Sequence, residues 1–140
     1  MRPRLLPVLA ACLALPVAGA AEPVAGAAPL TVELNAMEQQ EGACRLIFVA
    51  ENDADADLTA LVLEAVLFDR DGRVAALTLL DFRDLPAGRM RVRSFDMAGL
   101  DCTALDRLLI NDIATCEGAV TPDCAATLAL RSRLDIELLK

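Results

Sequence analysis

The stretch Leu58–Leu80, LTALVLEAVLFDRDGRVAALTLL, decides the fold that we expect for this chain. Its first half, Leu58–Phe68, is a nearly continuous apolar run, and the turn sequence Asp69-Arg70-Asp71-Gly72 follows. Glycine tolerates the positive φ that a tight hairpin turn requires. A second apolar run, Val74–Leu80, comes directly after the turn. The stretch therefore predicts a β-hairpin of two largely buried strands.

Similar short runs with turn signals between them lie on both sides of this hairpin. They predict further strands at 30–35, 44–50, 89–95, 107–113 and 128–138, with a short helical turn at 103–106. About seven strands in one chain indicate an all-β fold, an antiparallel, immunoglobulin-like β-sandwich over residues 29–140. Leucine and alanine are weaker strand formers than valine and isoleucine, so an α+β fold stays open as the alternative.

The first 28 residues differ in composition from the rest. Residues 1–4 carry two arginines, residues 5–21 have no charge, and Ala18-Gly19-Ala20 fits a small-residue cleavage site. This order predicts a cleaved signal peptide at 1–20, a flexible leader at 21–28, and a periplasmic or secreted product. Acylation of Cys12, as in a lipoprotein, is the alternative. No later apolar stretch is long enough to span a bilayer, so we expect no transmembrane segment in the mature chain.

Four cysteines remain after removal of the predicted signal: Cys44, Cys102, Cys116 and Cys124. An even number in an exported chain predicts two disulfides. A strand over residues 107–114 would be about 26 Å long, whereas bridged Cα atoms lie within about 7 Å. Cys102 and Cys116 would lie at opposite ends of that strand. We therefore favour Cys116–Cys124, which flanks a loop, together with Cys44–Cys102.

The composition excludes several function classes. The chain has no histidine, tryptophan or tyrosine, so it cannot form a Ser-His-Asp or Cys-His catalytic set. Its net charge is −8, from 13 basic and 21 acidic residues. An acidic chain repels the phosphate backbone, and we expect no nucleic-acid partner.

The hairpin sequence resembles a known family. Leu67, Phe68 and Asp69 are similar to the last part of the Phe-x-Leu-Tyr-Asp motif of the FxLYD-type domain, although Ala65 stands in place of its first phenylalanine. The turn Leu85–Gly88 also resembles the proline-glycine turn of that family, and the resemblance covers about Leu46–Phe95. It implies an extracytoplasmic, immunoglobulin-like β-sandwich without general catalytic residues.

Acidic residues provide two further hypotheses. Asp53, Asp55 and Asp57, with Glu64 at the twelfth position, have the ligand spacing of a calcium-binding loop, but Leu58 occupies the position that needs glycine. A solvated acidic loop is the competing interpretation. The second hypothesis is a carboxylate-based hydrolase, whose candidate residues lie near turns: Asp69, Asp71, Asp81 and Asp84. Turn chemistry explains the same residues without catalysis.

Basic and apolar residues raise two more alternatives. Arg89, Arg91 and Arg93 share one parity and form a candidate anion-binding patch, near Arg131 and Arg133 if the last strand lies beside them. Pairing of these arginines with neighbouring acids is the competing interpretation. Five leucines are candidates for either the core or a lipid-holding cavity: Leu61, Leu63, Leu67, Leu77 and Leu79.

From these features we expect a non-catalytic binding or structural module without a cofactor. Its partner is expected to be another envelope protein, bound through an exposed strand edge.

Overall fold

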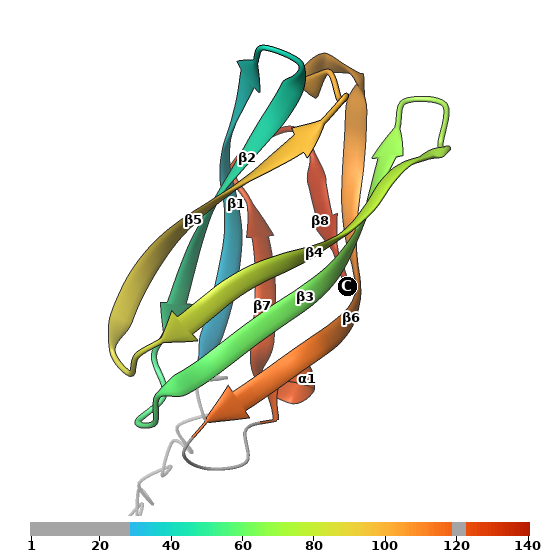
Figure 1. Cartoon of the computed structure of the whole chain (residues 1–140). Coiled ribbons are helices and arrows are strands. Elements are labelled where there is room, and N and C mark those ends of the chain that lie inside the picture. The colour runs from blue at the N-terminus through green and yellow to red at the C-terminus, as the bar shows by residue number, and fades with distance from the viewer. Residues whose placement is uncertain (1–28, 119–122) are drawn as a thin grey trace, which may run out of the picture.

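The computed structural model describes residues 29–118 and 123–140, which form a β-sandwich of two four-stranded sheets (Figure 1). The expected signal peptide at 1–20, the leader at 21–28 and Cys12 lie outside the described residues. No helix within the described residues is long and apolar enough to cross a membrane. The predicted all-β sandwich is confirmed.

The eight strands divide equally between the two sheets. Sheet A has the order β5-β2-β1-β7, and sheet B has the order β4-β3-β6-β8. A short 3-10 helix, η1, precedes β6, and a single helical turn, α1, precedes β7. The bounds are β1 Leu30–Gln40, β2 Ala43–Asn52, β3 Leu58–Asp69, β4 Val74–Leu85, β5 Arg89–Ala98, η1 Cys102–Ala104, β6 Leu105–Gly118, α1 Cys124–Thr127, β7 Leu128–Ser132 and β8 Glu137–Leu139.

The expected hairpin is formed by β3 and β4, and its turn is closed by Asp69. The Asp69 carboxylate accepts hydrogen bonds from the backbone N–H groups of Asp71 and Arg73, at 2.9 and 2.8 Å. Gly72 has a φ of 75°, and its N–H donates to the Asp69 carbonyl oxygen. An aspartate at the start and a glycine at the left-handed position are the residues that this turn requires.

The core lies between the sheets and contains three phenylalanine rings from three strands. Phe48, Phe82 and Phe95 come from β2, β4 and β5, and their ring centroids are 5.4–5.9 Å apart in edge-to-face arrangements. Leucines of β3 complete the centre of the core, where Leu61, Leu63 and Leu67 are fully buried. The sequence left two interpretations open for five leucines, the core or a lipid-holding cavity. Three of the five are therefore core residues.

The C-terminal segment differs from the expected single strand at 128–138. It divides into β7, which pairs with β1 in sheet A, and β8, which pairs with β6 in sheet B. A series of bends at 133–136 carries the chain from one sheet to the other. Both pairings are parallel, so the sandwich is not antiparallel throughout. The apolar alternation continues through the bend because each half still has one side against the core.

Two disulfides join the elements, in the pairs that the sequence analysis favours. Cys44 of β2 bonds to Cys102 of η1, with Cα atoms 5.0 Å apart, and so links sheet A to the start of β6 in sheet B. Cys116 of β6 bonds to Cys124 of α1, with Cα atoms 6.2 Å apart. Two such bonds indicate an oxidising, extracytoplasmic environment.

Candidate functional site

The outer face of sheet B carries a row of apolar side chains that crosses all four strands. Leu77 of β4 is in register with Val66 of β3, Val66 with Leu109 of β6, and Leu109 with Leu139 of β8. These four residues are called the apolar row below. The core cluster contains the alternate residues of β3 from Leu61 to Leu67 but not Val66. The row therefore lies on the opposite side of the sheet, where its neighbours cover Val66 to 7% exposed.

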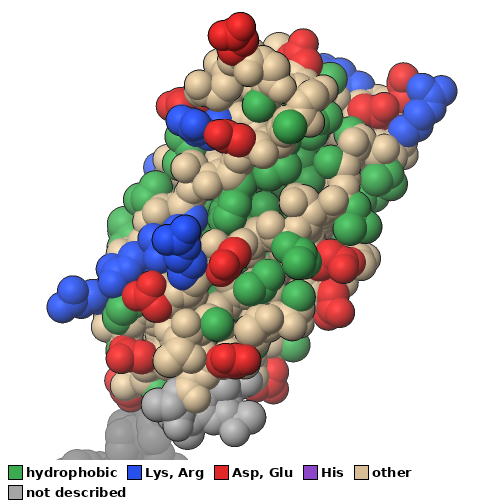
Figure 2. Space-filling view, in the orientation of Figure 1, with side chains coloured by type: hydrophobic (Ala, Val, Ile, Leu, Met, Phe, Trp, Pro, Cys, Tyr) green, Lys and Arg blue, Asp and Glu red, His purple; other side chains and the backbone are tan. Residues whose placement is uncertain are grey.

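Further apolar residues of β4 and β3 widen this row into a face. Leu79 and Val74 flank Leu77 on β4, and Phe68 follows Val66 on β3. We call these three residues and the apolar row the sheet B face. Figure 2 shows hydrophobic side chains gathered over this side of the molecule. Of six large hydrophobic residues that are exposed within the described residues, four belong to this face, with exposed fractions of 63% for Leu77, 59% for Val74, 57% for Leu79 and 39% for Leu139.

Charged residues lie among these apolar side chains. Glu64 of β3 is in register with Leu79 on one side and Asp112 on the other, and it accepts a hydrogen bond from Asn111 at 2.5 Å. At the opposite end, the Arg107 guanidinium lies over the Phe68 ring, 5.0 Å from its centroid. The sheet B face is therefore apolar in the middle, acidic at one end and covered by a cation at the other.

The aspartates of the calcium hypothesis are not gathered into a site. Asp57 accepts a hydrogen bond from the Ala87 N–H at 2.7 Å, so its carboxylate holds the β4–β5 turn. Glu64 lies on the outer face of sheet B, where its carboxylate accepts a hydrogen bond from Asn111. Within the described residues, no group of three or more acidic or cysteine side chains is placed to hold a metal ion.

The loop that contains these aspartates is organised by a buried neighbour, Asn52, which is only 2% exposed. Its side-chain nitrogen donates to the carbonyl oxygens of Ala56 and Leu85, at 2.9 and 2.8 Å. Its side-chain oxygen accepts from the Ala54 N–H at 3.1 Å. One buried amide thus joins the end of β2, the β2–β3 loop and the end of β4. Sequence analysis did not single out this residue, because a lone asparagine before an acidic loop carries no distinguishing pattern.

The candidate anion patch is largely occupied by internal contacts. Arg91 and Arg93 both approach the Asp84 carboxylate, at 3.7 and 3.6 Å. Arg93 also donates to the Phe82 carbonyl oxygen at 2.9 Å. These contacts join β5 of sheet A to β4 of sheet B, while Arg89 remains exposed. Two of the three arginines therefore close one side of the sandwich.

The arginines of the last segment lie on the other side of sheet A. Arg133 contacts Glu33 of β1 at 2.6 Å, and Asn35 donates a second hydrogen bond to the same carboxylate oxygen at 2.9 Å. The hydrogen bonds from Asn35 and then from Arg133 lower the pKa of Glu33 below its ordinary value. This pair neutralises a surface charge of sheet A.

The carboxylates of the hydrolase hypothesis each have a local partner. Asp69 caps the β3–β4 turn, and Asp71 pairs with Arg73 at 3.3 Å. Asp81 accepts from the Arg83 N–H at 2.8 Å, where Arg83 has a positive φ of 59°. Turn and edge contacts account for these positions.

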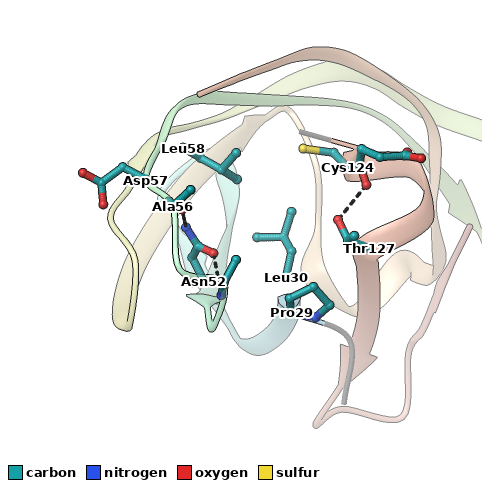
Figure 3. A pocket seen from close by; sticks show the side chains of 10 residues that line it. Pro29, Leu30, Asn52, Ala56, Asp57, Leu58, Cys124 and Thr127 are labelled. Carbon is teal, nitrogen blue, oxygen red and sulfur yellow. Dashed lines mark hydrogen bonds between the residues drawn. The ribbon is translucent and has the colours of Figure 1, made fainter. Parts of the chain in front are cut away.

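One pocket lies at the end of the sandwich where β1 begins. Its volume is about 170 Å³, below the roughly 300–1,000 Å³ typical of small-molecule sites. Figure 3 shows its mostly apolar lining, with Leu30 and Leu58 opposite α1. The polar atoms of the Asn52 side chain beside it are engaged by backbone groups. The pocket therefore offers no free polar group from Asn52 to orient a ligand.

The sequence did not indicate that two leucines of β4 are exposed. Leu77 and Leu79 were expected in the core or in a cavity, but Ala76, Thr78 and Leu80 supply the inward parity of β4. Because apolar residues occupy both parities of Val74–Leu80, no alternation marks which side is exposed.

Comparison with known proteins supports the fold. No family model matches this chain, and no curated protein matches it. The solved structure of IrmA from Escherichia coli is similar, with a TM-score of 0.53 and 10% sequence identity over 72% of this chain and 89% of that one. At this identity the similarity concerns the fold alone. The resemblance to the FxLYD-type domain stays a prediction from the sequence.

Proposed function

We propose that this protein is a periplasmic or secreted, non-catalytic binding module that holds a protein partner on the sheet B face. The observation that carries the proposal is the exposure of Leu77, Leu79, Val74 and Leu139 on one side of one sheet. Contiguous exposed apolar residues on a small protein mark an interaction surface, because leaving them in water forgoes favourable burial.

The charges around the face define the chemistry of the partner. Glu64 of β3 lies beside Leu79, Asp112 of β6 lies on the other side of Glu64, and Asp81 follows Leu79 on β4. The whole chain is also acidic, with a net charge of −8. We therefore infer a partner surface that combines apolar side chains with lysine or arginine, since opposite charges at the rim favour association and exclude acidic competitors.

The experiment compares two pairs of substitutions of equal chemistry. Leu79→Glu with Leu139→Glu alters both ends of the sheet B face, whereas Met90→Glu with Val92→Glu alters sheet A residues that are 55% and 58% exposed. A photo-crosslinking residue at position 79, expressed in the natural host, identifies the partner. We expect the purified partner to bind the sheet A variant as it binds the unmodified chain, and the sheet B variant at least tenfold more weakly.

Two outcomes of these experiments would contradict the proposal. Equal binding by the two variants, or crosslinking at position 92 in place of position 79, would place the interaction elsewhere. Both variants must first show the unfolding transition of the unmodified chain, so that a loss of binding is not a loss of fold.

A further inference from the structure

A cleft opens between the two sheets at the corner where the chain crosses from β7 to β8. On sheet A, β7 pairs with β1 only as far as Leu34, whereas β1 continues to Gln40. On sheet B, β8 pairs with β6 from Arg107, whereas β6 begins at Leu105. At this corner, therefore, neither β7 nor β8 covers the edge of its sheet.

Apolar side chains form much of the lining of this cleft. We call it the corner cleft, and it lies between Met37 of β1, Leu105 of β6, and Leu134 and Ile136 of the bend. Met37 is in register with the buried Leu46, and it packs against the core together with Leu134 and Ile136, although all three remain partly exposed. The volume of the cleft is about 540 Å³, within the roughly 300–1,000 Å³ typical of small-molecule sites.

Hydrogen bonds hold two sides of the corner cleft in place. The Arg133 N–H donates to the Leu34 carbonyl oxygen at 3.0 Å and so ties the bend to β1. On the side of η1, the Arg70 guanidinium donates from Nε to the Thr103 carbonyl oxygen at 2.8 Å. A ligand therefore meets a largely formed cleft, which reduces the cost of ordering it on binding.

Two aspartates also line the corner cleft. Asp135 is exposed and has no hydrogen-bond or ion-pair partner within the part of the chain that the structure describes. Asp106 is 45% exposed and contacts Arg107 at 3.0 Å through Oδ2, which leaves Oδ1 to accept from a ligand. The lining thus has two acids and one arginine, Arg70, in a chain whose net charge is −8. This balance favours a cation over an anion.

We propose that the corner cleft binds a small primary amine with an apolar chain. The chain of the ligand lies against Met37, Leu134 and Ile136, where it removes partly exposed carbon from water. Its ammonium group donates hydrogen bonds to the carboxylates of Asp106 and Asp135. A quaternary ammonium fits less well, because it has no N–H to donate and the lining has no aromatic ring to receive it.

This site is separate from the sheet B face, because none of the residues that line the corner cleft belongs to that face. Partner binding and amine binding can therefore fail independently, and neither proposal rests on the other.

Methionine methyl groups report where an amine binds. With ¹³C-labelled methionine methyls, hexylamine should shift the Met37 signal until it saturates, at the millimolar concentrations expected for a ligand of this size. Met90 is the matched control, because it is 55% exposed and lies on sheet A outside the cleft. Equal shifts of the two signals would show unspecific contact and overturn the proposal. Absence of a saturable Met37 shift up to about 20 mM hexylamine would also overturn it.

Ligands with the same six-carbon chain test the charge. At low ionic strength, hexylamine should bind at least about threefold more tightly than hexanol, hexanoate or hexyltrimethylammonium. Added salt should reduce this preference, because the two carboxylates are screened. Hexanol that binds as tightly as hexylamine would contradict the role of the acids. A lysine-containing peptide that shifts the Met37 signal at far lower concentration than hexylamine would assign the cleft to a protein partner and refute the small-molecule site.

Substitutions in the lining test the same contacts from the side of the protein. Asp106→Asn and Asp135→Asn remove a charge at nearly constant size, and each should weaken hexylamine binding about threefold while leaving hexanol binding unchanged. Asp55→Asn is the control, because it removes an exposed carboxylate in the β2–β3 loop, outside the cleft. All variants should keep the unfolding transition of the unmodified chain. If both cleft variants bind hexylamine like the Asp55 control, the proposed site is wrong.

Discussion

At the scale of single residues, Asn52 is the polar side chain on which the loop end of the sandwich depends. Replacement by alanine leaves the Ala56 and Leu85 carbonyl oxygens and the Ala54 N–H without their partner. Leaving such groups unpaired typically costs about 1–3 kcal/mol each when they are buried, so we expect Asn52→Ala to lower the free energy of unfolding by about 3 kcal/mol.

Urea denaturation measures this loss. The control is Asn111→Ala, which removes one exposed hydrogen bond to Glu64 and should change the unfolding free energy by less than about 0.5 kcal/mol. A loss for Asn52→Ala no larger than that of the control would show that water replaces the missing amide.

Glu33 predicts how stability depends on pH. Its folded pKa lies below the ordinary value of 4.5, first because Asn35 and then because Arg133 hydrogen-bonds the carboxylate. The unfolded chain therefore binds the proton more tightly. The stabilisation is fully present above pH 4.5 and is lost as pH falls through the lower folded pKa.

An NMR titration of the Glu33 carboxyl group checks this prediction. Arg133→Ala and Asn35→Ala should each move the pKa of Glu33 upward, towards 4.5. The unmodified chain should lose stability to a greater extent than either variant as pH falls below 4.5. A Glu33 pKa at or above 4.5 in the unmodified chain would contradict the prediction.

At the scale of elements, the sequence predicted where strands and turns occur better than it predicted which side of a strand is exposed or which sheet a strand joins. The β3–β4 hairpin was predictable because Asp69 and Gly72 are the residues that its turn requires. The exposed side of β4 was not, because apolar residues occupy both of its parities. The division of β7 from β8 was also hidden, since a strand that changes sheets keeps its inward alternation. Local chemistry defines turns, whereas the side of a strand that is exposed depends on what packs against it.

The two disulfides should differ in their contribution to stability. Cys44–Cys102 has a sequence separation of 58 residues, and Cys116–Cys124 has one of 8. If stabilisation comes from the reduced entropy of the unfolded chain, the first contributes about 4 kcal/mol and the second about 2.5 kcal/mol. We expect the alanine pair at 44 and 102 to unfold at lower urea concentration than the pair at 116 and 124. The opposite order would mean that loop length does not govern the effect.

At the scale of the whole molecule, the disulfides connect the fold to the compartment. If their effects add, the two disulfides contribute about 6.5 kcal/mol, while small domains have only about 5–15 kcal/mol of total stability. The reduced chain is therefore expected to be marginally stable. This dependence on disulfides is the physical reason to propose export. Processing after Ala20 is an expectation from the sequence alone, since residues 1–28 lie outside the described structure.

Production in two compartments tests this dependence. The chain from residue 21, made in a reducing cytosol, should contain four free thiols and melt at least about 15 °C below the oxidised form. The full-length chain, recovered from the extracytoplasmic fraction, should begin at Ala21 and contain no free thiol. Oxidation of the cytosolic product should restore its melting temperature. An unprocessed, reduced chain with the stability of the oxidised one would separate the fold from export, because the sandwich would then be stable without its covalent links.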